Sequence, residues 1–289
     1  MIYKSSLLLV SVVLSALTLT QAHGAQLVII IDDIGNNYEL GNAMVELKGP
    51  LTLAFLPHTP YAKRLANKAY LHHKEIILHA PMENTVKAAL GPGALTQELT
   101  ETELKQTLKK AIASIPHIQG INNHMGSALT QNKQSMKWVM ETLKNEQLYF
   151  VDSLTSPKSV AYKLAQQQGL PSLRRHVFLD NNKSLTSLNK QWKQALRISK
   201  KYGSAVLIAH PYTESHEFLA QKIPELNNQN IKLVPASQLF LDHAWEAFDN
   251  EKPHNNQHTN RYMLQSEKTS TFNSEELNSP LNLLSNSTH

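Results

Sequence analysis

The feature that most constrains the fold is the segment QLVIIIDDIG at residues 26–35, where five apolar residues run directly into two adjacent carboxylates. Four of the five are β-branched, and a short run of this kind followed by a turn signal predicts a strand buried on both faces of a parallel sheet. Ligands and catalytic groups gather at the carboxyl ends of such strands. Asp32 and Asp33 are therefore candidate site residues, with capping of the following turn as the structural alternative.

Apolar runs alternate with segments of helical spacing along most of the chain. Further strands are predicted at residues 51–56, 75–79, 120–123, 148–152, 176–180, 205–210 and 231–235. Helices are predicted at residues 37–48, 61–72, 100–114, 133–145, 159–168, 185–202 and 215–227. Thr100 and Glu103 have the spacing of a capping box at the start of the third helix. Strand and helix alternation with short links predicts a parallel sheet, and this number of strands favours a barrel.

Polar side chains stand where several of these strands end. They are His79 followed by Glu83, and then His124, Asp152, Asp180 and His210. In a parallel barrel all of these strand ends share one rim, so we expect the residues to converge. Imidazole with carboxylate is the ligand set of a divalent metal, for which zinc is our first expectation. Structural roles remain open at this point, including an ion pair of Asp180 with Arg174 or Arg175.

The two ends of the chain differ in composition from the middle. Residues 1–24 have a lysine, an apolar core and small residues at a cleavage spacing, which is typical of a signal peptide. Residues 249–289 are polar and poor in apolar side chains, so we expect a disordered tail after a single domain at residues 25–248. The protein is therefore expected to be exported or periplasmic, without a stable membrane span after cleavage. The chain has no cysteine, and it has no basic and aromatic cluster that would favour nucleic acid as a partner.

Six motifs together resemble a known family. In chain order they are VIIIDDIG, EIILHAPME, GINNHMGS, FVDSLT, RRHVFLDN and VLIAHP. They are similar to motifs of the divergent polysaccharide deacetylases, the YibQ-like, exported relatives of the carbohydrate esterases that have a NodB fold. The resemblance extends over residues 26–241 and implies an α/β fold, a distorted seven-stranded (β/α) barrel.

The resemblance also implies roles for individual residues. Asp32 matches the catalytic base and Asp33 a metal ligand, while His210 matches the late histidine that acts as the acid. His79 matches the first histidine of an H-x-x-x-H ligand motif, but the second histidine of that motif is Glu83 here. The third ligand is then either Glu83 or His124. We favour His124, which stands at the next strand end, where the ordinary enzymes carry an Arg-Pro motif.

The remaining candidates would contact a metal ligand or orient the substrate, namely Glu83 if it is not a ligand, Asn123, Asp152, Arg175 and Asp180. The implied function is metal-dependent hydrolysis of N-acyl groups on a polysaccharide, with peptidoglycan as one candidate substrate. Such an enzyme is a carbohydrate deacetylase, acting on C–N bonds other than peptide bonds. The alternative is a non-catalytic glycan-binding or cell-envelope scaffold protein that keeps the barrel. Hydrolysis of another bond, such as a phosphoester, is less favoured because the sequence has no phosphate-cradling glycine-rich loop.

Overall fold

A computed structural model of the protein describes residues 24–240. The predicted signal peptide, apart from its last residue, and the predicted polar tail both lie outside this range. Among the described residues, no helix combines the length and the apolar character that a membrane crossing requires.

Strands and helices alternate along residues 24–240. The strands are β1 (Ala25–Ile34), β2 (Thr52–Phe55), β3 (Glu75–Met82), β4 (Ile118–Met125), β5 (Tyr149–Asp152), β6 (Ser172–Arg174), β7 (Val177–Phe178), β8 (Ser204–Ala209) and β9 (Ile231–Leu233). The α-helices are α1 (Tyr38–Glu46), α2 (Ala62–Leu71), α3 (Glu101–Ser114), α4 (Lys133–Glu146), α5 (Ala161–Gln167), α6 (Leu185–Tyr202) and α7 (Thr213–Lys222). Two short 3-10 helices, Leu129–Gln131 and Pro224–Gln229, complete the described part of the chain.

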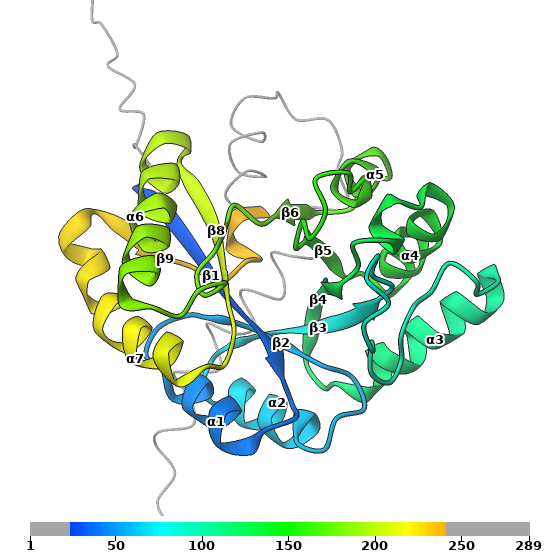
Figure 1. The fold of residues 1–289 in the computed structure, drawn as a ribbon, viewed down its shortest axis with the longest axis horizontal. Coiled ribbons are helices and arrows are strands. Elements are labelled where there is room, and N and C mark those ends of the chain that lie inside the picture. The colour runs from blue at the N-terminus through cyan, green and yellow to red at the C-terminus, as the bar shows by residue number, and fades with distance from the viewer. Residues whose placement is uncertain (1–23, 241–289) are drawn as a thin grey trace, which may run out of the picture.

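The strands form one parallel sheet that curls into an open barrel. Their order is β6-β5-β4-β3-β2-β1-β8-β7, and β9 adds a further parallel pairing to β1. The helices lie around the outside of this sheet (Figure 1). The two edge strands, β6 and β7, are separated in the chain by only Arg175 and His176. The N–H of Arg175 donates to Asp152 on β5 and that of His176 donates to Val206 on β8, so the chain itself crosses the gap in the barrel.

The expected parallel α/β fold is confirmed, with differences in detail. The sheet has nine strands within residues 24–240, whereas the sequence pattern predicted eight and the family resemblance implied seven. The strand expected at residues 176–180 is only Val177–Phe178, and β6 was not predicted, because three residues are too few to give an apolar run. The last helix ends at Lys222, five residues earlier than expected, since Pro224 begins a separate 3-10 helix. The capping box of Thr100 and Glu103 is present.

Alternate residues of each strand enter two different cores. On β1, Leu27 and Ile29 belong to the larger core between the sheet and the helices. Val28 and Ile30 belong to a smaller core inside the barrel. Because side chains of a strand alternate between its two faces, this division identifies which positions of every strand point into the barrel. It therefore also identifies which strand-end residues can meet there.

Candidate metal centre

The inward-facing positions of four strands continue past the apolar core as polar side chains. On β1, Asp32 follows Val28 and Ile30, and on β3, His79 follows Ile77. His210 likewise follows Ile208 at the end of β8. On β4, Asn122 and His124 are two residues apart and share this inward face. The polar residues therefore meet at the carboxyl end of the barrel because of strand periodicity.

Asp33 does not follow this alternation, because its neighbour Asp32 already faces inward. The pairing of β1 with β2 shifts its register between Ile31 and Ile34, and Asp33 has a φ of 60°. Such an irregularity bends a strand and re-aims the side chain at that point, and the left-handed backbone is one that aspartate tolerates better than most residues. The local distortion allows two adjacent carboxylates to enter the same site.

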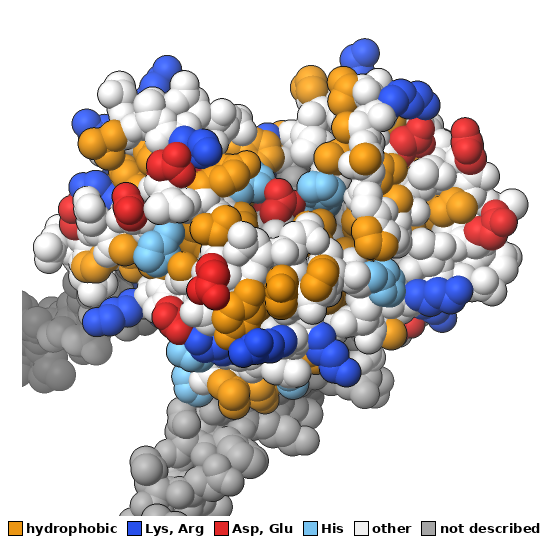
Figure 2. All heavy atoms as spheres, turned by 60° about the horizontal axis from the view of Figure 1, so that its bottom comes forward, with side chains coloured by type: hydrophobic (Ala, Val, Ile, Leu, Met, Phe, Trp, Pro, Cys, Tyr) orange, Lys and Arg blue, Asp and Glu red, His pale blue; other side chains and the backbone are white. Residues whose placement is uncertain are grey.

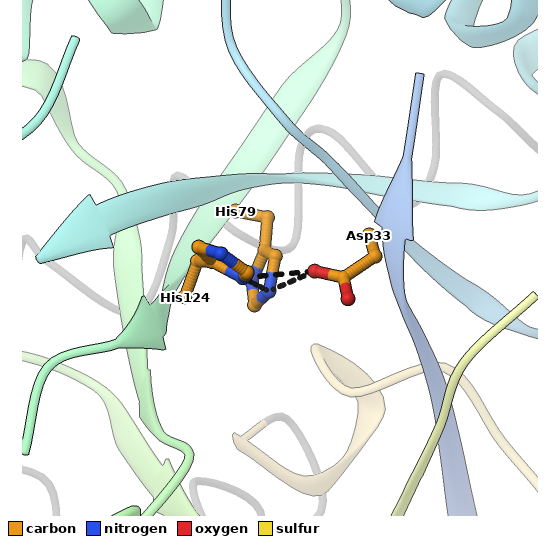
Figure 3. Close-up of side chains that lie close together, drawn as sticks. All are labelled: Asp33, His79 and His124. Atoms are coloured by element: carbon orange, nitrogen blue, oxygen red, sulfur yellow. Dashed lines mark hydrogen bonds and ion pairs between the residues drawn. The ribbon is translucent and has the colours of Figure 1, made fainter. Parts of the chain in front are cut away.

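Three potential ligand atoms converge at the end of the barrel (Figure 3). Asp33 Oδ1 lies 2.8 Å from His124 Nδ1 and 3.1 Å from His79 Nε2. The two imidazole nitrogens are 3.2 Å apart. Two ligands bound at about 2.0–2.1 Å to a tetrahedral zinc ion lie roughly 3.3 Å apart, so the three separations are close to those that such an ion requires. In space-filling view, acidic and histidine side chains lie in a hollow near the middle of one face (Figure 2).

The state of the Asp33 carboxylate also fits a metal ligand. Asp33 Oδ1 is buried and has no partner with hydrogen-bond geometry, although the two imidazole nitrogens approach it closely. Burial alone would raise the pKa of Asp33, but the contacts with His124 and His79 outweigh it and hold that pKa well below its usual range. The carboxylate is therefore ionised and oriented toward the two imidazoles. The chemistry of the donors, one carboxylate oxygen and two imidazole nitrogens, suits zinc or a similar divalent ion.

Asn122 links the predicted ligand His79 to the predicted base Asp32. Its Oδ1 lies 2.7 Å from His79 Nδ1, and its Nδ2 donates to Asp32 Oδ1 at 2.7 Å. Because the amide oxygen can only accept, His79 carries its proton on Nδ1 and leaves Nε2 available for a metal. A hydrogen bond that fixes the tautomer and the ring orientation is typical of metal-binding histidines.

Asp32 is a buried carboxylate beside the three converging residues. It is 2% exposed, and its Oδ2 lies 3.7 Å from His79 Nε2. Burial raises the pKa of Asp32 above its ordinary value, although the charges of His79 and His210 act in the opposite direction. A carboxylate whose pKa is raised accepts a proton more readily than an ordinary one, and this is the property of a general base.

His210 is partly exposed and forms a dyad with the buried Asp180 at the end of β8. Its Nδ1 lies 2.8 Å from Asp180 Oδ1. The other carboxylate oxygen accepts from the His210 N–H at 2.7 Å and from the Ser215 hydroxyl at 2.6 Å. Burial acts to lower the pKa of His210, but Asp180 and the negative charges of Asp32 and Asp33 raise it to about 9. The imidazole is thus protonated at neutral pH, as a general acid must be.

Several predicted site residues do not join this cluster. Glu83 lies just past the end of β3, and its Oε2 accepts from the N–H and the side chain of Gln97. Asn123 faces the opposite side of β4 from Asn122, where it bonds to Ser153 N and Met125 O. The structure thus gives Glu83 and Asn123 partners in the surrounding loops. Of the two candidates for the third ligand, it brings only His124 to Asp33 and His79.

Asp152 and Arg175 stabilise the loop that follows β5. Asp152 accepts from the N–H of Leu154 and the hydroxyl of Ser159, so it organises the chain before α5. Arg175 donates to the carbonyls of Ser153 and Leu154. The alternative ion pair of Asp180 with an arginine is wrong, because Asp180 pairs with His210.

Sequence reasoning missed Asn122 and selected its neighbour Asn123. The signal was available, since residues 122 and 124 must share a strand face and His124 was already a candidate ligand. Ser215 was also missed, because it lies in α7 and nothing in the local sequence relates it to Asp180.

Comparisons with known proteins identify the family. The sequence model of the divergent polysaccharide deacetylases matches residues 29–240. The uncharacterized protein YibQ of Escherichia coli K12 is 33% identical over 215 residues, which cover 74% of this chain and 67% of YibQ. An uncharacterized protein of Haemophilus influenzae Rd is 32% identical over 216 residues, covering 75% of this chain and 77% of its own.

A solved structure has the same fold. The crystal structure of the uncharacterized protein ATU2773 from Agrobacterium tumefaciens C58 aligns with a TM-score of 0.73 at 22% identity, covering 76% of this chain and 91% of that one. The family model spans the described barrel from β1 to the end of the described residues, and it includes each of the converging side chains. The chain therefore belongs to the divergent polysaccharide deacetylase family.

Proposed function

We propose that this protein is an exported, metal-dependent hydrolase that removes N-acyl groups from a polysaccharide, with peptidoglycan as the first candidate substrate. The observation that carries the proposal is the convergence of Asp33, His79 and His124 on one point, beside a buried carboxylate, Asp32. Family membership supports a glycan substrate. Export rests on the signal-like sequence of residues 1–24.

The chain's own residues divide the proposed reaction among them. Asp33, His79 and His124 would hold the metal, which when bound polarises an amide carbonyl and lowers the pKa of water toward about 7. Asp32 accepts the proton of the attacking water, because its raised pKa makes it basic. The hydrogen bond from Asn122 fixes the Asp32 carboxylate in place. Asn122 holds the His79 ring so that Nε2 faces the centre.

His210 supplies the proton that the departing amine needs. Its pKa of about 9 keeps the imidazole protonated at neutral pH, and Asp180 fixes the ring through Nδ1. A base and an acid whose pKa values are shifted by different environments are the usual arrangement for acid–base catalysis. Here burial raises the pKa of the base, Asp32, and a carboxylate partner raises the pKa of the acid, His210.

The test compares the wild-type protein with Asp32→Asn on chitin oligomers and on peptidoglycan, with zinc and other divalent ions supplied. Asp32→Asn keeps the side-chain size, so bound metal is expected to stay while turnover falls by about 10²–10⁴-fold, the range of a lost general base. Glu83→Gln is the matched control and should retain turnover. Unchanged turnover in Asp32→Asn would remove Asp32 from the role of base. Saturable glycan binding without product under any metal would overturn the proposal and support the non-catalytic glycan-binding alternative.

A further inference from the structure

A groove of about 410 Å³ lies directly beside the metal centre, and His124 forms part of its wall. Two loops form most of the rest, one after β2 at residues 56–60 and one after β3 at residues 89–92, and Asn36 and Pro81 complete it. The volume is within the range of about 300–1,000 Å³ that is typical of small-molecule sites. Nothing in the proposed reaction so far uses this groove.

The wall of the groove is mainly apolar. Its apolar side chains include Leu56, Pro57, Pro60, Pro81, Leu90 and Pro92. Among the described residues that line it there is no Asp, Glu, Lys or Arg, and its polar members are Asn36, His58, Thr59 and His124. A glycan chain carries an oxygen or nitrogen atom on every carbon of its sugar rings and needs many hydrogen-bonding partners, so this wall suits a hydrocarbon better than a sugar.

Backbone contacts hold both loops in place. The N–H of Leu56 donates to Ile34 at the end of β1, and the hydroxyl of Thr59 donates to the Leu56 carbonyl. The loop after β3 is held by Asn84, whose Oδ1 accepts from the N–H groups of Val86 and Ala88. The first wall therefore has fixed partners, and the second is anchored at residues 86 and 88, immediately before it, so the groove is largely formed before any ligand enters. A preformed site avoids the entropic cost of ordering loops on binding.

The groove is continuous with the centre through the sheet itself. Pro81 on β3 pairs with His124 on β4, and both residues line the groove. His124 directs Nδ1 at Asp33 Oδ1. An amide whose carbonyl lies at the centre can therefore extend its acyl chain past His124 and along the apolar wall.

We propose that this groove binds the acyl chain of the substrate and selects N-acyl groups longer than acetyl. The inference rests on the proposed function and deepens it, by naming the acyl part of the substrate. An acetyl group has three heavy atoms and, at about 30 Å³ for a group the size of water, occupies on the order of 90 Å³. The groove is several times larger, and its apolar wall stabilises each additional buried methylene.

The test measures binding of straight-chain alkyl hydroxamates, from acetohydroxamate to octanohydroxamate, to the full chain supplied with zinc. A hydroxamate ligates the metal through its head group, so the series changes only the length of the chain and requires no turnover. Each methylene that enters an apolar site contributes about 0.8 kcal/mol, or about fourfold in affinity. In the wild-type protein we expect affinity to rise by this factor for each methylene until the groove is filled.

Two variants on the same loop locate the effect. Leu90→Trp fills the groove and should abolish the rise, while leaving acetohydroxamate affinity within about twofold of wild type. Val86→Trp is the matched control, because Val86 is on this loop but 79% exposed and outside the groove lining. It should retain the full rise. Acetohydroxamate binding itself reports that each variant is folded and holds the metal.

The outcomes separate this inference from the proposed reaction. A flat or falling series in the wild type, or an equal rise in both variants, overturns the acyl groove even if N-acetylated glycans are hydrolysed. A rise that only Leu90→Trp abolishes supports the groove even if no glycan is hydrolysed, and in that case the proposed reaction fails alone. If zinc-supplied protein binds no hydroxamate at all, both ideas are overturned.

Discussion

The two ends of β3 place inward-facing polar residues in opposite situations. At its start, Glu75 is 5% exposed and accepts from Thr52 Oγ1 at 2.6 Å and from the N–H groups of Ala236 and Ser237 at 2.7 and 3.1 Å. Four residues later on the same face, His79 points its Nε2 at Asp33, whose Oδ1 has no hydrogen-bond partner. At one end of the barrel, hydrogen-bond donors satisfy the Glu75 carboxylate. At the other end, hydrogen-bond acceptors face one another.

The difference shows how a structural polar group can be told from a functional one. The Glu75 carboxylate has a donor for each oxygen, so it needs nothing more and joins the carboxyl-terminal segment to the barrel. At the other end, Asp33, His79 and His124 bring three electron-rich atoms within 3.2 Å of one another. Only a shared cation or proton stabilises that arrangement. Stability is thus expected to depend on the first end and metal binding on the second.

The largest effect is expected from Glu75→Ala. This change removes the acceptor of the Thr52 hydroxyl and of the Ser237 N–H, and it leaves the Ala236 N–H with Thr52 Oγ1 alone. The loss costs on the order of 3–5 kcal/mol of unfolding free energy. Urea unfolding of the metal-free protein measures it, and exposed Glu46→Ala is the control that should change stability little. Metal affinity of folded Glu75→Ala should equal that of wild type. A stability as high as wild type would contradict the structural role of this end.

At the opposite end, Asp33→Ala and His124→Ala should each lower metal affinity by more than 100-fold. A loss of about 10–100-fold is typical of outer-shell partners, and these residues are predicted ligands. Competition against a chelator, with metal content of the purified protein, measures the change. Glu83→Gln should keep the metal, because Glu83 is bonded to Gln97 instead. Metal lost in Glu83→Gln and kept in His124→Ala would reverse this assignment.

Replacement of Asn122 by leucine should produce a smaller loss of metal affinity. It removes the acceptor of His79 Nδ1 and the donor to Asp32 at nearly constant volume, so metal affinity should fall by about 10–100-fold. Asn123→Leu is the neighbouring control, since Asn123 faces the other side of β4 and contacts Ser153 N. It should lower stability without this loss of affinity. Equal losses in both variants would mean that the effect is one of folding.

The smallest effect concerns pH and the His210–Asp180 pair. Folding raises the pKa of His210 from about 6.5 to about 9. A raised pKa stabilises the folded state fully below pH 6.5, and this stabilisation is lost as the pH rises through about 9. We expect about 1–2 kcal/mol, less than the full shift would give, because the imidazole is partly exposed. The free energies of unfolding of metal-free wild type and of His210→Gln, compared at pH 6 and at pH 9.5, measure this contribution. An equal difference between the two proteins at both pH values would exclude the pair as its source.

Much of the fold could be predicted because it depends on local patterns. The run at residues 27–31 predicts the buried central strand, and Thr100 predicts the start of α3. The shortest strands could not be predicted, since β6 and β7 depend on pairing with β5 and β8 more than on their own side chains. Tertiary pairing decides such segments.

For the site, the sequence predicted which residues stand at strand ends but not which way they face. Position along a strand follows from where the apolar run stops, and this located Asp32, His79, His124 and His210. The direction of a side chain follows from alternation within the strand, and by this rule Asn122 faces the site in place of the predicted Asn123. Asp33 is a further case, because its inward direction depends on a local break in strand register that no pattern in the sequence indicates.

The position of β1 in the sheet has a consequence for how the chain folds. This strand comes first among the described residues, yet it pairs with β2, β8 and β9. During synthesis its most apolar segment, residues 27–31, therefore cannot complete its pairing until β8 and β9 at the other end of the domain have emerged. Such long-range pairing slows folding and prolongs the lifetime of aggregation-prone intermediates. The segment that leads into the two aspartates is thus the one most in need of protection while the chain is being made.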